Sequence, residues 1–161
     1  HLVNWEMVML KYLLASAVSV AGALTFPASI QAEPINFRAT LLVSCIIVVT
    51  DGALAPNGDY TLLSSENTGG LPATATVTAL GGAPRLTFTA PTITSSADVT
   101  GVTPQIRYVS PGGANQPYTS SQTTYNQSGL LGTYTVNAQA SKPTGFNVGT
   151  YTIGTVLTCS G

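Results

Sequence analysis

Apolar and polar residues alternate through much of the chain, a pattern typical of β-strands rather than of helices. In residues 35–45 the apolar side chains take every second position, and Arg38 and Thr40 are among the polar residues between them. Because successive side chains of a strand point to opposite faces, this segment is predicted to be a half-buried strand. The apolar run continues to Val49 and stops at the turn residues 51–52.

Further strands are expected wherever the alternation returns, at intervals of roughly ten residues. Glycine, proline and asparagine separate these segments, and none of them has the spacing of a helix. The expected strands lie at residues 60–63, 73–80, 85–90, within 91–101, at 105–110, and in two late runs that begin with Gly-Thr-Tyr-Thr at 132 and 149.

The connections between the strands carry predictions of their own. Residues 81–84 read Gly-Gly-Ala-Pro, which favours a tight turn and a hairpin between 73–80 and 85–90. Residues 142–145 join the two late runs, either as a hairpin or as a connection that crosses between sheets. Residues 111–127 are predicted to be a polar loop and the longest irregular stretch.

Seven or eight short strands without a helix predict an all-β protein. The leading architecture is an antiparallel β-sandwich, and a small β-barrel is the alternative. A chain of 161 residues allows one domain, which we assign to residues 33–161.

The first part of the chain is organised like a secretory signal peptide, which we assign to residues 9–32. Lys11 precedes an apolar run that ends at Pro27. That run is shorter than the roughly 20 residues of a membrane-spanning helix, so a membrane anchor is the weaker interpretation. No anchor is expected in the mature chain, and residues 1–8 are interpreted as read-through from upstream sequence.

Charge is scarce, and this excludes some classes of partner. Charged residues make up 7% of the chain, against about a quarter in typical soluble proteins, and the formal net charge is −1. Nucleic acids and anionic membranes are bound by clustered lysine and arginine, which this sequence lacks. We therefore expect no nucleic-acid partner.

The sequence contains two cysteines, Cys45 and Cys159. In an exported protein that reaches an oxidising compartment, two such residues most often pair, so a structural disulfide between them is predicted. It would tie the first strand to the last. For a closed loop of about 115 residues, the idealised chain-entropy model predicts a stabilisation of somewhat over ~4 kcal/mol, and usually less in practice.

Catalysis is not expected, and neither a cofactor nor a metal is predicted. His1 is the only histidine, so residues 33–161 have no imidazole base or ligand, and no Gly-x-Ser-x-Gly motif is present. Asp51 and Asp59 flank a turn and are interpreted as turn-capping residues. Weak calcium binding with the neighbouring Asn57 is the less favoured interpretation.

Two tyrosines are candidates for ligand binding. Tyr118 and Tyr125 lie in the predicted loop at 111–127, and tyrosine combines stacking area with a polar tip. Binding residues often sit on loops held by a rigid scaffold. A role as loop filler is the competing interpretation.

The exported, Thr-, Gly- and Ala-rich chain resembles bacterial chaperone/usher pilins and the related spore-coat-U-like secreted proteins. The resemblance is carried by the short leader, the alternating strand that runs into Cys45, and the late Gly-Thr-Tyr-Thr strands. It implies an immunoglobulin-like sandwich completed by an extended segment from a neighbouring subunit or a periplasmic chaperone. The candidate strand-exchange segment is then marked by Ile35, Phe37, Ala39, Leu41 and Val43.

Two functions follow from these features. The first is an exported structural or adhesive subunit of a fimbria or coat, which assembles with copies of itself through strand edges and has no catalytic activity. The second is a monomeric secreted module that binds a glycan or protein through residues 111–127, in which case the segment that precedes Cys45 is the domain's own first strand. Either protein would lie in the periplasm, at the cell surface or outside the cell.

Overall fold

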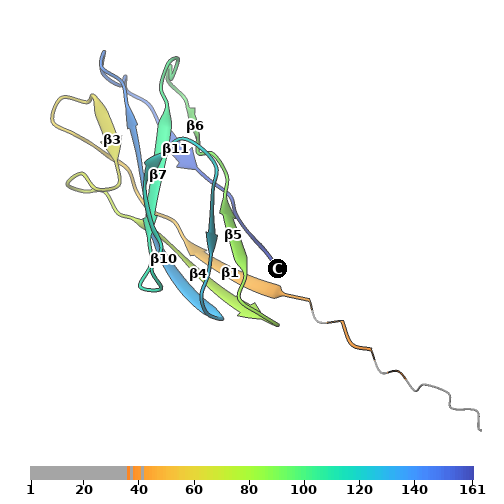
Figure 1. Ribbon diagram of the computed structural model, residues 1–161. Helices are drawn as coiled ribbons and strands as arrows, with labels where there is room; N and C mark the ends of the chain where they lie inside the picture. Colours follow the sequence, from red (N-terminus) through yellow and green to blue (C-terminus); the bar gives the residue numbers. More distant parts are fainter. Residues whose placement is uncertain (1–35, 37, 41) are drawn as a thin grey trace, which may run out of the picture. The chain divides into compact units, whose positions relative to one another are not determined.

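The computed structural model describes residue 36, residues 38–40 and residues 42–161 (Figure 1). The chain divides into two units, residues 1–38 and 39–161, and the fold below is that of the second. The predicted leader at 9–32 and the preceding residues 1–8 lie outside the described residues.

A large antiparallel sheet contains seven of the strands. Along it lie β1 (Ser44–Thr50), β4 (Ala73–Leu80), β10 (Leu131–Ser141), β7 (Pro104–Val109) and β8 (Asn115–Thr119), in that order. β10 is the central strand, because its first half pairs with β4, its last residues pair with β3 (Leu62–Ser64), and its other edge pairs with β7. The short β2 (Ala55–Pro56) pairs with β3.

The remaining strands form two small antiparallel sheets. In one, β5 (Arg85–Phe88) lies between β12 (Leu157–Ser160) and β9 (Thr123–Asn126). In the other, β6 (Thr92–Ser95) pairs with β11 (Tyr151–Gly154). Between the two sheets, the Thr89 amide donates to the Val156 carbonyl at 3.0 Å. The pair β5 and β12 therefore continues into the pair β6 and β11.

The hydrophobic core joins the large sheet to the three-stranded one. Fully buried side chains include Val77 on β4, Phe88 on β5, Tyr108 on β7 and Tyr134 on β10. The ring centroids of Phe88 and Tyr108 are 4.1 Å apart in a stacked arrangement. The Tyr134 hydroxyl donates to Gln127 Oε1 at 2.9 Å, which satisfies the polar tip of a buried ring. The described residues thus form an all-β unit of packed antiparallel sheets without a helix.

Several sequence predictions are confirmed, and the strand expected at 73–80 has the predicted bounds. The disulfide between Cys45 and Cys159 is present and joins the first strand to the last. The late runs are joined by the sheet-crossing connection and not by a hairpin, since β10 pairs within the large sheet and β11 pairs with β6. A closed barrel is excluded because the sheets do not join into one ring.

Three predictions about local structure were wrong. The strand expected at 35–45 begins only at Ser44, and the described residues before it belong to no strand. β4 and β5 do not form a hairpin, because Gly81, at a φ of 86°, lies in a connection between different sheets. The predicted loop at 111–127 contains β8 and β9, whose polar residues are held by pairing to β7 and β5.

Candidate functional site

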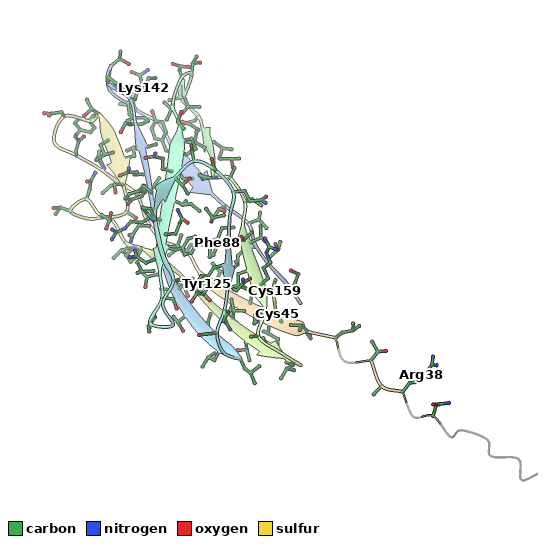
Figure 2. All side chains as sticks on the ribbon, viewed as in Figure 1. Arg38, Cys45, Phe88, Tyr125, Lys142 and Cys159 are labelled. Atoms are coloured by element: carbon green, nitrogen blue, oxygen red, sulfur yellow. A yellow bond between two sulfur atoms is a disulfide. The ribbon has the colours of Figure 1, made fainter. Side chains whose placement is uncertain are left out.

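One side of the unit is formed by strand edges from different sheets. Here β1 and β12 are joined by the disulfide between Cys45 and Cys159, whose Cα atoms lie 6.4 Å apart (Figure 2). A disulfide of this kind is consistent with an oxidising location outside the cytoplasm.

These edges have no partner strand within the part of the chain that the structure describes. β1 pairs only with β4, β12 only with β5, and β11 only with β6. No backbone hydrogen bond between described residues joins β1 to β11 or β12. Natural proteins usually protect such edges with charges, prolines or covering segments. Neither β1 nor the β11–β12 stretch at residues 151–160 carries a charge or a proline.

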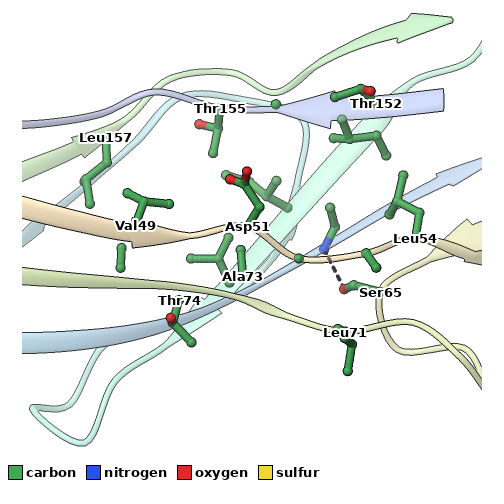
Figure 3. Close-up of a pocket in the computed structure, with 18 of the residues that line it drawn as sticks. Val49, Asp51, Leu54, Ser65, Leu71, Ala73, Thr74, Thr152, Thr155 and Leu157 are labelled. Carbon is green, nitrogen blue, oxygen red and sulfur yellow. Dashed lines mark hydrogen bonds between the residues drawn. The ribbon is translucent and has the colours of Figure 1, made fainter. Parts of the chain in front are cut away.

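Beyond the disulfide, a cavity of about 410 Å³ opens between the end of β1 and the β11–β12 stretch (Figure 3). Its lining reaches the core residues Phe88 and Ile106. Val49 belongs to the same face of β1 as Cys45 and Ile47, which pack against the core, yet Val49 is 56% exposed at the mouth of this cavity. The core is therefore open on this side.

The lining of the cavity is mostly apolar, and Ser65, Thr74, Thr152 and Thr155 contribute hydroxyl groups to it. Asp51 is the one charged residue in its lining, and Figure 3 shows it between β1 and Thr155. The Thr155 hydroxyl donates to the Thr89 carbonyl at 2.8 Å. Gly52 borders the cavity where a Cβ would lie 2.5 Å from the Leu71 carbonyl oxygen, so only glycine fits there. Such a lining suits an extended apolar segment.

The predicted strand-exchange residues are only partly described. Ala39 is exposed and Val43 is half-buried, whereas Ile35, Phe37 and Leu41 lie outside the described residues. A Cβ at Gly161 would lie 2.5 Å from Val43 Cβ, so Val43 packs against the last residue of the chain.

The candidate ligand residues Tyr118 and Tyr125 lie on strands of different sheets, β8 and β9. Tyr125 packs against the core, and its hydroxyl donates to the Gly112 carbonyl at 2.8 Å. Tyr118 donates to Glu66 Oε2 at 2.6 Å. Desolvation and the bond to Glu66 raise the pKa of Tyr118 to about 12. Each hydroxyl thus has a partner within the fold.

Sequence reasoning missed the polar cluster to which Tyr118 belongs. Arg107 Nη2 lies 2.6 Å from Glu66 Oε1, and its guanidinium stands 5.7 Å from the centre of the Tyr118 ring. Through these contacts Glu66, in the loop after β3, binds Arg107 on β7 and Tyr118 on β8. No sequence signal marks it, because its members are far apart in the chain and meet only through sheet pairing.

Among the described residues, no group of three or more His, Cys, Asp or Glu side chains is arranged to hold a metal ion. Within the same residues, no helix is long and apolar enough to cross a membrane.

The open side between β1 and the β11–β12 stretch is thus the best-supported candidate site. Comparison with known proteins found no matching family model, no matching curated protein and no matching solved structure.

Proposed function

We propose that the protein is an exported structural or adhesive subunit that assembles by strand addition. A segment of a neighbouring copy would insert between β1 and the β11–β12 stretch. The observation that carries this proposal is the uncharged, unpaired pair of edges above a cavity that reaches the core. An inserted strand would satisfy the free backbone groups of both edges and cover the exposed apolar surface.

The candidate donor is residues 35–43 of the neighbour. These nine residues span about 30 Å when extended, similar to the length of the acceptor stretch at 151–160. Their alternation would turn the apolar set marked by Phe37 and Leu41 toward the cavity and the polar set toward solvent. The described residues of this segment take part in no strand of their own chain. Leu42 and Val43 pack against Gly81 and Gly161 of their own domain, so the availability of the segment is supported for the residues before them.

The strand order supports an immunoglobulin-like sandwich that lacks its final strand. In that fold, one sheet has the order A-B-E-D, and strand G lies beside strand F in the other. β1, β4, β10 and β7 fit the first order, while β5 and β12 fit strands C and F. No described strand occupies the place of G. In this proposal a neighbouring copy supplies strand G. A periplasmic chaperone is a second candidate, which would occupy the place of strand G before assembly.

The proposal is tested on the full chain, expressed with its leader and purified from an oxidising compartment. The wild-type protein is expected to form oligomers in size-exclusion chromatography with light scattering. Phe37→Ser combined with Leu41→Ser should shift it to monomer, because two apolar groups can no longer enter the acceptor cavity. Asn36→Ser combined with Thr40→Ser, on the other face of the same segment, should leave assembly unchanged.

A wild-type protein that stays monomeric at high concentration and is not recovered with a chaperone would contradict the proposal. Equal assembly of both double variants would contradict it as well, since the alternation would then have no role. Thermal melting of each variant shows whether a loss of assembly reflects unfolding of the acceptor domain.

A further inference from the structure

The end of the unit opposite the disulfide carries a second cavity, of about 680 Å³. It lies between the turn at residues 57–61 and the connection at 142–149, near Lys142 in Figure 2. We call it the tip cavity. Its size falls within the range of roughly 300–1,000 Å³ typical of small-molecule sites. We propose that the tip cavity binds a neutral sugar, with Tyr60 as the stacking platform.

The backbone at Tyr60 is the first observation. Tyr60 has a φ of 57°, the one non-glycine residue with positive φ in the described chain. Its amide donates to the Asn57 carbonyl at 3.2 Å, so it follows a tight turn at a position that glycine usually takes. The Tyr60 side chain is 61% exposed, so burial does not offset the strain. A strained, exposed aromatic residue points to a functional constraint.

The loop that presents Tyr60 is firmly held. Asn57 Oδ1 accepts bonds from the amides of Thr61 at 2.9 Å and Leu62 at 3.0 Å. The Tyr60 carbonyl accepts a bond from the Phe146 amide at 2.7 Å, which ties the turn to the opposite wall of the cavity. The aromatic side chain therefore stands on a preorganised loop, which lowers the entropy cost of binding a ligand.

The opposite wall is equally supported. Phe146 and Tyr151 pack edge to face with their ring centroids 5.2 Å apart. The Tyr151 hydroxyl donates to the Asn147 carbonyl at 2.6 Å. These contacts fix the backbone of the connection and leave the Asn147 side chain exposed at the cavity.

The chemistry of the lining selects the class of ligand. Among the described residues the side chains of Asp59 and Asn147 line the cavity without a hydrogen-bond partner, and no lysine, arginine or histidine joins them. Lys142 lies near the cavity but does not line it, and its ammonium group is paired with Asp98 at 3.0 Å. An unpaired carboxylate in the lining therefore disfavours an anionic ligand. A sugar ring offers a C–H face to the Tyr60 ring and hydroxyl groups to the carboxylate and the amide. This inference does not depend on strand addition, which uses the other cavity.

The test uses the full, oxidised protein and a panel of neutral sugars: glucose, galactose, mannose, N-acetylglucosamine and their common disaccharides. Saturation-transfer NMR is expected to detect at least one of them. Tyr60→Asn should weaken that binding by about tenfold or more, and Tyr60→Phe, which keeps the ring, should retain it. Asn tolerates positive φ, so the melting temperature of Tyr60→Asn should not fall. Leu131→Ala, which alters an exposed residue on the large sheet, is the matched control.

Three outcomes would overturn the inference. One is that no neutral sugar in the panel binds. Another is that Tyr60→Asn binds as tightly as the wild type. The third is that sulfated or sialylated sugars, measured beside the panel in the same way, bind more tightly through Tyr60 than the neutral sugars, because the site would then recognise a different chemistry.

Discussion

Removal of the disulfide tests how the open side is held together. Cys45 and Cys159 are 114 residues apart in sequence, and the chain-entropy relation assigns about 4.8 kcal/mol to a loop of that length. Structure that remains in the unfolded chain reduces this figure, so we expect Cys45→Ala with Cys159→Ala to lower the free energy of unfolding by about 3–4 kcal/mol. The fold should persist, because all seven residues of β1 still pair with β4.

Urea unfolding of the full chain followed by circular dichroism measures this loss. The m-value should rise in the variant, because an unfolded chain without the cross-link exposes more surface. Ser44→Ala with Ser160→Ala alters the neighbouring residues on the same strands without touching the bridge and serves as the control. A loss below about 1 kcal/mol with an unchanged m-value would refute the chain-entropy argument for this protein.

Two other predictions concern the core and the loops. Phe88→Ala should cost about 3–5 kcal/mol in urea unfolding, because the ring is buried between Tyr108 and Tyr134; a loss near zero would remove it from the core. Hydrogen bonds from Thr100 and then Lys142 lower the pKa of Asp98 from 3.8 to about 2. The stability from this carboxylate is present above about pH 4 and is lost as the pH falls toward 2. Asp98→Asn should therefore weaken the dependence of the melting temperature on pH in this range. A variant whose melting temperature falls with pH as steeply as that of the wild type would contradict this.

The sequence predicted the parts of the fold that rest on local alternation. Residues 73–80 form a strand as expected, because apolar residues and threonine alternate there. Ala75, Val77 and Ala79 are buried, whereas the residues between them are more exposed. Residues 115–119 and 123–126 were missed because their side chains are mostly polar. These short strands are held by hydrogen bonds to β7 and β5, and no local pattern reports such partners.

For the candidate sites too, the sequence predicted only what local alternation can show. The alternation in residues 35–43 predicted a strand, and the resemblance made it the candidate strand-exchange segment. Neither could show that the described part of this segment lies outside the domain's own sheets. The cavity on the open side combines β1 with residues 152–157, which are distant in sequence. The tip cavity depends on the backbone conformation of Tyr60, since a tyrosine after Asn-Gly-Asp carries no sequence signal of its own.

By itself the sequence determined that the chain is β-rich and that Cys45 and Cys159 pair, because both follow from residue types and their spacing. Tertiary structure decided which strands are neighbours, which edges have no partner and where cavities form. Strand pairing depends on contacts between residues far apart in the chain, and a period of two specifies the face of a side chain but not the partner of the strand.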